Sequence, residues 1–371
     1  MEDVFRFADE WGPLKLVHIH RPAIGLKAAV AIDNIACGPA IGGVRMAPDV
    51  STEEAFRLAR AMTFKNAAAG LPHGGGKSVI WGDPKMKPAD KQQLIRGFAT
   101  AIADLVDYIP GPDMGTDELA MGWIRDETGR AVGLPREIGG IPLDEIGATG
   151  FGLNAAIDVA REFVGLDIKG TRFVVQGFGS VGKHAARFLA QKGAVLVGAS
   201  DSQGTIADDA GLDVAALIAL KEQGRPLHDF SRGRKLGPDA VIDLGCDIWI
   251  AAARPDVIHE GNVERLRTRL LVQGANIPVT EKAEAALAAR GVLIIPDFIA
   301  NAGGVICAAM ELRHATEAAA FAAIDEKIRA NTRAVMEATR RTGALPRAAA
   351  MSLAQERIRR AAQTRRWHAA S

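Results

Sequence analysis

Hydrophobic and polar positions follow two different rhythms along this 371-residue chain. From Thr149 onward, short runs rich in valine, isoleucine and leucine are separated by alanine-rich stretches with helical spacing, and several of these stretches end at a glycine. Runs of this kind are typical of parallel strands that are buried on both faces. We expect such strands at residues 172–176, 194–200, 247–252, 270–273 and 292–296. The second half therefore predicts a doubly wound α/β domain.

The first half has a mixed pattern. It predicts strands at residues 15–20 and 26–33, a helix at 51–69 that begins with a capping box at Ser51 and Glu54, and a helix at 91–106. Glycine and proline interrupt this half at Gly38-Pro39, Gly42-Gly43, 110–112 and 139–142. We expect those four segments to be loops or turns. Beyond about residue 315 the chain is expected to be helical.

Composition narrows the class of function. Hydrophobic residues make up 48% of the chain, which supports a substantial core, and 45 basic against 44 acidic residues give a net charge of +1. This balance argues against a general nucleic-acid or membrane-surface binder and favours a small-molecule substrate. Three widely spaced cysteines argue for reduced thiols. With no signal-peptide pattern at the N-terminus, we expect a cytoplasmic protein.

Two lysines enclose a segment of small residues between positions 65 and 77. Lys65 follows Leu58 and Met62 on the apolar stripe of its helix and should point inward. Three glycines precede Lys77, so we expect a hairpin in which positive φ angles let the backbone approach a ligand. Burial would lower the pKa of a lysine and suit it to proton transfer. Taken singly, each lysine could instead extend from a helix end or occupy an exposed turn.

A glycine-rich turn between a predicted strand and a predicted helix indicates a dinucleotide site. Gly177 allows the tight turn, Gly179 lets a pyrophosphate approach the helix N-terminus, and Gly182 lets helix and strand pack closely. Asp201 ends the next strand, where an acid would bind the adenosine ribose. Asp201 followed by the small Ser202 favours NAD, although a neighbouring cation would permit NADP.

Three further polar residues stand in loops that could belong to a site. Asp113 lies in a rigid proline and glycine loop, where it could instead serve turn or helix-start chemistry. Asn276 and Asn301 follow predicted strand ends, where ligands bind in open α/β sheets, although asparagine also caps helices.

Taken together, these motifs resemble the glutamate/leucine/phenylalanine/valine dehydrogenase family. The matching segments are GPAIGGVR (38–45), TFKNAAAG (63–70), GGGK (74–77), PDMG (112–115), ATG (148–150), GFGSVG (177–182), GAN (274–276) and NAGG (301–304). The resemblance implies an N-terminal α/β substrate domain with a mixed sheet, a C-terminal Rossmann-like doubly wound domain, and a cleft between them. We place the substrate and oligomerisation domain at residues 1–147 and the NAD(P) domain at 148–335, with helices of 336–371 packing back on the first domain.

The resemblance also implies an activity and roles for residues. Such enzymes catalyse the reversible oxidative deamination of an L-amino acid to a 2-oxo acid and ammonium, with NAD, or NADP, as cofactor and without a metal. Lys77 and Asp113 would be catalytic, and Lys65 would bind the substrate carboxylate. Gly42, Ile41, Ala308, Asn276 and Asn301 would complete the substrate site. The cofactor would contact Gly177, Gly179, Ser180, Val181, Gly182, Asp201, Ser202, Thr149, Ala252, Asn276 and Asn301. A homo-oligomer is implied, as a dimer, hexamer or octamer.

Departures from the family pattern bear on the substrate. Glutamate-specific members carry a lysine and a serine where this chain has Ile41 and Ala308, so we expect an apolar substrate, branched or aromatic. Two alternatives stay open. Glutamate, or another acidic amino acid, could be bound with Arg254 in place of the missing lysine, or the chain could be a catalytically inactive, cofactor-binding regulator.

Overall fold

The chain folds into two units of contacting residues, and the computed structural model describes residues 5–365. Among these, the first unit comprises residues 5–142, 305–320 and 351–365, and the second comprises 143–304 and 321–350. The sequence-based boundary at residue 147 stays a prediction about functional domains. We expect residues 336–371 to pack back on the first domain. Of these, residues 351–365 group with the first unit and 336–350 with the second, while 366–371 lie outside the described residues.

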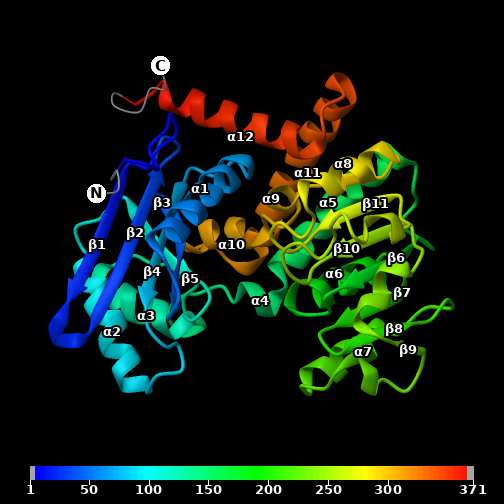
Figure 1. Cartoon of the computed structure of the whole chain (residues 1–371), viewed down its shortest axis with the longest axis horizontal. Coiled ribbons are helices and arrows are strands. Elements are labelled where there is room, and N and C mark those ends of the chain that lie inside the picture. Colours follow the sequence, from blue (N-terminus) through cyan, green and yellow to red (C-terminus); the bar gives the residue numbers. More distant parts are fainter. Residues whose placement is uncertain (1–4, 366–371) are drawn as a thin grey trace. The chain divides into compact units, whose positions relative to one another are not determined.

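The first unit is built on a five-stranded mixed sheet in the order β1-β2-β4-β3-β5 (Figure 1). Its strands are β1 (Lys15–Arg21), β2 (Leu26–Asn34), β3 (Ala40–Ala47), β4 (Gly74–Trp81) and β5 (Tyr108–Pro112). Its helices are α1 (Thr52–Ala68), α2 (Pro88–Ala101) and α3 (Glu118–Thr128), together with most of α10 (Gly303–Glu311) and of α12 (Pro346–Ala362).

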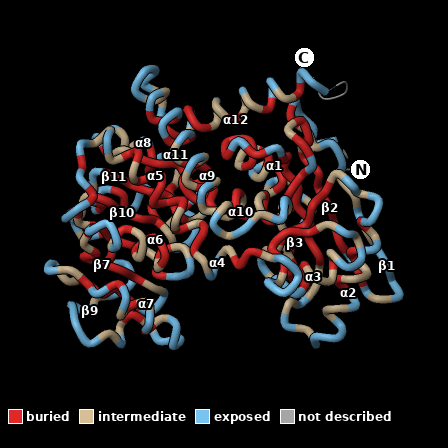
Figure 2. The backbone as a smooth tube through the Cα atoms, turned by 180° about the vertical axis from the view of Figure 1, so that it is seen from behind, coloured by how far each residue is buried: buried red, intermediate tan, exposed pale blue. Residues whose placement is uncertain are grey.

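Alternation along β2 explains how this sheet is layered. Val30 and Ile32 pack into a core with residues of α2 and α3, whereas Ala29 and Ala31 pack on the opposite face with residues of α1. Side chains of a strand point alternately to the two faces, so one strand contributes to both cores. The small residues on the α1 face let that helix lie close to the sheet, and the strands form the buried centre of the unit (Figure 2).

The second unit is the doubly wound domain that the sequence predicts. Its sheet runs β12-β11-β10-β6-β7-β8-β9, with parallel pairing from β12 to β7 and antiparallel pairing of β8 and β9. Its strands are β6 (Arg172–Gln176), β7 (Val195–Asp201), β8 (Gly204–Ala207), β9 (Arg234–Leu236), β10 (Ile248–Ala251), β11 (Leu270–Gln273) and β12 (Leu293–Ile295).

Helices cover both faces of this second sheet. Val174 of β6 packs with Leu287 of α8, while its neighbour Val175 lies against Gly182 of α6. The α-helices of the second unit are α4 (Leu143–Ile146), α5 (Ala148–Val164), α6 (Ser180–Gln191), α7 (Val214–Glu222), α8 (Glu281–Ala289), α9 (Asp297–Ala300) and most of α11 (Glu317–Thr342). Short 3-10 segments lie at Pro22–Ile24, Arg136–Ile138, Leu227–Asp229, Pro238–Asp243 and Val263–Arg265. No described helix is long and apolar enough to cross a membrane.

Three expectations for the first half are wrong. Gly42-Gly43 and residues 110–112 are not loops but parts of β3 and β5, and the segment between Lys65 and Lys77 is not a hairpin, because it leads from the end of α1 into β4. The three glycines of β4 also have no positive φ. They are required by packing within the protein.

The measured contacts give the reason. A Cβ on Gly74 would lie 1.7 Å from the Asn34 carbonyl oxygen, and one on Gly75 would lie 2.1 Å from the Thr63 nitrogen. These positions face β2 and α1, so the close neighbour is the chain itself and not a ligand. The helix expected at 91–106 is also shifted, since α2 begins at Pro88 and ends at Ala101.

A substitution at Gly75 tests this packing. Gly75→Ala would press a methyl group against the α1 backbone, and we expect the free energy of unfolding to fall by about 1–3 kcal/mol. Urea denaturation measures it. Gly245→Ala is the control, because no atom lies within 4 Å of a Cβ there. Equal stability of the two variants would contradict the packing argument.

Candidate active site and dinucleotide site

Lys77 and Asp113 form an ion pair across the central part of the first sheet. Lys77 lies in β4 and is only 5% exposed, and Asp113 directly follows β5. The Lys77 Nζ atom lies 2.8 Å from Asp113 Oδ1. Strand β3 runs between β4 and β5, and a Cβ on its Gly43 would lie 2.7 Å from Asp113 Cβ and 3.1 Å from Lys77 Nζ. Glycine at this position therefore leaves the space in which the two side chains meet.

The pair continues into a chain of alternating charges. Arg45 of β3 donates from Nε to Asp113 Oδ2 at 2.7 Å and from Nη1 to Glu54 Oε1 of α1 at 2.5 Å. Each carboxylate is thus flanked by a cation. Sequence reasoning included Arg45 only as the last residue of a matching segment and did not assign it a role.

Burial and pairing act against each other on these pKa values. Burial lowers the pKa of the Lys77 ammonium below its ordinary value, and the Asp113 carboxylate offsets this only in part. Burial would raise the pKa of Asp113, but Lys77 and Arg45 outweigh it and hold that pKa below its usual range. The pair therefore presents an ammonium that is more acidic than usual beside a carboxylate that stays ionised.

The alternative roles considered for Asp113 and Lys77 do not describe this geometry. Asp117, not Asp113, caps α3, by accepting a hydrogen bond from the Ala120 N–H at 2.9 Å. The Asp113 N–H donates to the Thr116 hydroxyl at 3.1 Å, and that hydroxyl lies 2.7 Å from the Val44 carbonyl, to which it can donate. The loop is thus fixed against β3. Lys77 is a buried strand residue and not an exposed turn residue.

The predicted substrate residues of the first unit have different surroundings. Lys65 lies half-buried in the last turn of α1. Gly42 is buried, and its carbonyl accepts a hydrogen bond from the Tyr108 hydroxyl at 2.9 Å. Ile41 and Ala308 pack together in one apolar cluster with Ile109, Val132 and the partly buried Leu312. The two positions that depart from the glutamate pattern are therefore neighbours in space.

The turn between β6 and α6 has the form expected of a dinucleotide site. Gly177 has φ +91°, and a Cβ on Gly182 would lie 2.1 Å from the Gly177 carbonyl oxygen. A Cβ on Gly179, in contrast, would meet nothing within 4 Å, and this residue begins α6 without a side-chain cap. Open space at uncapped helix amides fits a pyrophosphate.

A cavity of about 630 Å³ opens beside this turn. Of the predicted cofactor residues it is lined by Gly177, Gly179, Asp201, Ser202 and Ala252. Arg254, for which we considered a role in substrate binding, also lines this cavity. Ser180 and Val181 contribute the first turn of α6, and the Ser180 hydroxyl already lies 3.2 Å from Asp144 Oδ1.

Asp201 is satisfied by the protein itself. Its Oδ1 accepts hydrogen bonds from the N–H groups of Gln203 and Gly204 at 3.0 and 3.3 Å, and its Oδ2 accepts from Leu227 N–H and Lys221 Nζ, each at 2.9 Å. Burial raises the pKa of Asp201, but these donors outweigh burial and lower it. Lys221 stands on α7 and was not predicted, since no local motif marks it. It lines the cavity together with Arg254 and His259.

Asn276 and Asn301 form an amide pair beyond the ends of β11 and β12. Asn301 Nδ2 donates to Asn276 Oδ1 at 3.0 Å, and the buried Asn301 Oδ1 has no hydrogen-bond partner in the structure. Thr280 caps α8, so Asn276 does not. Thr149 lies against the segment that follows Asn301, because its Oγ1 is 3.2 Å from the place of a Cβ on Gly304. An unpaired buried acceptor can take a hydrogen bond from a donor such as a carboxamide or a ribose hydroxyl.

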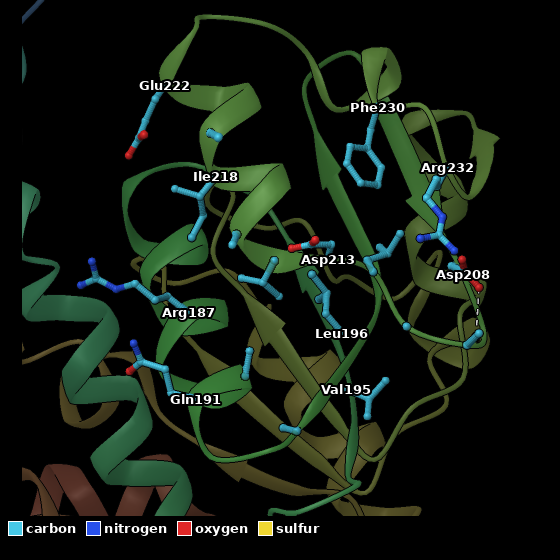
Figure 3. Close-up of a pocket in the computed structure, with 18 residues that line it drawn as sticks. Arg187, Gln191, Val195, Leu196, Asp208, Asp213, Ile218, Glu222, Phe230 and Arg232 are labelled. Atoms are coloured by element: carbon cyan, nitrogen blue, oxygen red, sulfur yellow. Dashed lines mark hydrogen bonds between the residues drawn. The ribbon is translucent and has the colours of Figure 1, made fainter.

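A larger cavity lies elsewhere in the second unit. It measures about 840 Å³ and lies between α6, α7 and β7, lined by such residues as Arg187, Leu196, Ile218 and Phe230 (Figure 3). None of the predicted site residues lines it. Cavity size therefore does not mark the site in this chain.

Two family models match the chain. The family model described as Glutamate/Leucine/Phenylalanine/Valine dehydrogenase matches residues 139–366, and that of the Glu/Leu/Phe/Val dehydrogenase dimerisation domain matches residues 17–130. The chain belongs to this family. Its members are NAD(P)-dependent oxidoreductases that act on amino acids, which confirms the predicted family, the two-domain α/β fold and the enzyme class.

Individual relatives differ in the amino acid that they are named for. The chain is 36% identical to a glutamate dehydrogenase of Aeropyrum pernix, over 90% of this chain and 85% of that protein. It superposes with a TM-score of 0.84 on a hetero-hexameric glutamate dehydrogenase of Thermus thermophilus in its Leu-bound form, at 29% identity over 95% of this chain and 90% of the other. An L-tryptophan dehydrogenase of Nostoc punctiforme gives a TM-score of 0.75 at 26% identity, over 95% and 97% of the two chains.

The Lys77–Asp113 pair predicts a defined loss of stability in acid. Since the folded-state pKa of Asp113 is lowered, its contribution is present above the unfolded-state value of about 3.9 and is lost as the pH falls through the folded-state value. We expect Asp113→Asn to reduce the slope of unfolding free energy against pH by up to about 1.4 kcal/mol per pH unit below about pH 4. Urea titrations at stepped pH values measure this slope. The exposed Asp49→Asn should keep the wild-type slope; an unchanged slope in Asp113→Asn would contradict the assigned pairing.

Proposed function

We propose that this chain catalyses the reversible NAD(P)-dependent oxidative deamination of an L-amino acid to a 2-oxo acid and ammonium. The observation that carries the proposal is the buried Lys77–Asp113 pair, in which a lysine of lowered pKa lies 2.8 Å from a carboxylate. Such a pair suits a reaction that must both polarise a carbonyl and move protons at one carbon.

In the proposed reaction, Lys65 binds the substrate α-carboxylate and so orients the α-carbon. When bound, NAD(P)⁺ would supply the acceptor for the hydride that leaves this carbon in the deamination direction, once the amino group has lost a proton. Water adds to the resulting iminium carbon, and the Lys77 ammonium stabilises the developing oxygen charge. Asp113 accepts and returns the protons that allow the amino group to leave as ammonia. Arg45 holds the Asp113 carboxylate from its other oxygen at 2.7 Å.

Two candidate substrates are each supported by a separate observation. Glutamate is favoured by the likeness to glutamate dehydrogenases, which extends over 90% of the chain. An apolar amino acid is favoured by Ile41 and Ala308, which pack in one apolar cluster and offer no partner to a second carboxylate. A homo-oligomer is also part of the proposal, since residues 17–130 match a dimerisation domain.

The proposed enzyme can bind NADP as well as NAD, because cations offset the negative charge of Asp201, which would lie at the adenosine end of the coenzyme. Lys221 neutralises Asp201 at 2.9 Å, and Lys221, Arg254 and Ser202 line the same cavity. An acid that is already paired no longer repels a 2′-phosphate, and the cations attract it.

Reductive amination assays test the proposed function and distinguish glutamate from an apolar amino acid as the substrate. Purified protein is given NADH or NADPH, ammonium, and in turn 2-oxoglutarate or a branched or aromatic 2-oxo acid. We expect turnover, with Lys77→Met lowering kcat by about 10²–10⁴-fold. A clear preference for 2-oxoglutarate would overturn the apolar candidate, and preference for an apolar 2-oxo acid would overturn glutamate. Absence of turnover with every acid would leave the inactive-regulator alternative.

Coenzyme choice has its own test. Lys221→Met removes the cation beside Asp201, and we expect the KM for NADPH to rise about 10-fold or more, while the KM for NADH changes little. Lys183→Met is the control, since Lys183 is also on a helix of the second unit but does not line the cavity. An equal effect of Lys221→Met on both coenzymes would contradict the assignment.

A further inference from the structure

Arg347 carries a positive charge at the N-terminus of a helix, where positive charge is unfavourable. It lies in the first turn of α12, where the helix dipole is positive. Its side chain is nevertheless only 22% exposed, and its guanidinium carbon lies 5.6 Å from the centre of the Phe298 ring. Buried arginines are retained where acids and amides bind the whole guanidinium.

Three buried side chains provide those partners, each from a different element. Arg347 Nε donates to both carboxylate oxygens of Glu284 in α8, at 2.9 and 3.0 Å, and Nη2 donates to Gln273 Oε1 at the end of β11, at 2.8 Å. Nη2 also lies 3.0 Å from Asp297 Oδ1 at the start of α9. Gln273, Glu284 and Asp297 are each at most 5% exposed. One guanidinium therefore joins β11, α8 and α9.

Asp297 connects this cluster to the amide pair Asn276–Asn301. Its Oδ2 accepts the Ile277 N–H at 2.8 Å, and its carbonyl accepts the Asn301 N–H at 2.7 Å. Ile277 directly follows Asn276 and has φ +42°, which is strained for a β-branched residue. Such a conformation persists only where neighbouring groups hold it. The Asp297 carboxylate holds the Ile277 N–H, while the Ile277 carbonyl accepts a hydrogen bond from the Asp256 N–H at 3.0 Å.

We propose that Arg347 is a positioning residue for the amide pair, acting through Asp297. Arg347 fixes the Asp297 carboxylate, and this carboxylate holds Ile277 in its strained conformation. The Ile277 backbone in turn orients the side-chain amide of the preceding residue, Asn276, toward Asn301. The unpaired Asn301 Oδ1 is thereby kept ready for a donor at the nicotinamide end of the coenzyme. This inference rests on the proposed function in one respect, namely that the amide pair contacts the nicotinamide end.

A purely structural brace would behave differently. If Arg347 only stabilised the second unit, its loss would weaken every part of coenzyme binding alike, or would change stability alone. A positioning role affects the nicotinamide end and spares the adenosine end. The fragment ADP-ribose, which lacks nicotinamide, separates the two.

The experiment compares binding of NADH and NADPH with binding of ADP-ribose and 2′-phospho-ADP-ribose, by calorimetric titration of the full-length protein. Asp297→Asn is the main variant, because it breaks the link to Arg347 and leaves the Arg347–Glu284 pair intact. Arg347→Lys is the second, since one ammonium cannot span three partners. Arg333→Met is the matched control; it removes an exposed arginine of α11 that pairs with Glu162 at 3.0 Å.

We expect Kd for NADH and NADPH to rise about 10-fold in both test variants, with both fragments and the control unchanged. Wild-type affinity for the reduced coenzymes in both variants would overturn the inference, as would equal weakening of coenzymes and fragments. If the wild type bound fragments and coenzymes equally tightly, the contact at the nicotinamide end would be absent and the inference would fail while the fold stayed intact. Failure of the wild type to bind any of them would instead overturn the proposed function.

Discussion

The first unit depends on strands whose backbones lie too close for any side chain between them. A Cβ on Gly42 would lie only 1.5 Å from the Gly76 carbonyl oxygen. Strands β3 and β4 can therefore approach each other this closely only because residue 42 is a glycine. The next residue, Gly43, leaves the gap through which Lys77 reaches Asp113. The packing that builds the sheet therefore also builds the ion pair. A larger residue at either position would disturb fold and chemistry together.

The buried and partly buried charges around Lys77 and around Arg347 are compensated by neighbours of opposite sign. Lys77, Asp113, Arg45 and Glu54 alternate in charge, and Arg347 serves two acids in the second unit. Lys77, Glu284 and Asp297 are buried, so removing the partner of any of them would leave a buried charge without compensation. Some buried polar atoms of the described residues have no such partner, among them Gln176 Oε1 and Asn301 Oδ1. Gln176 lines the dinucleotide cavity, and Asn301 belongs to the amide pair that we propose to contact the coenzyme.

How far the sequence predicts the structure differs between the two halves for a physical reason. Buried parallel strands are continuous apolar runs, so β6, β7, β10, β11 and β12 could be read directly. In the first half, β3 and β5 contain glycine and proline, which local propensity assigns to turns, and only contacts between distant segments make them strands. The same limit applies to the site. Lys77 and Asp113 stand in recognisable motifs, whereas Lys221 and Arg347 act only through residues far away in sequence.

The conflict over the substrate also follows from what each observation measures. Identity over most of the chain counts every aligned position equally, whatever its role in binding the substrate side chain. Selectivity for the substrate side chain depends on a few positions such as Ile41 and Ala308, which contribute almost nothing to overall identity. Arg254 lines the cavity that Asp201 also lines and is not part of the cluster that contains Ile41 and Ala308. An acidic substrate then needs another cation, because a carboxylate buried without one costs several kcal/mol. The likeness to glutamate dehydrogenases favours glutamate, and if glutamate is the substrate the chain must supply this cation from outside the cluster of Ile41 and Ala308.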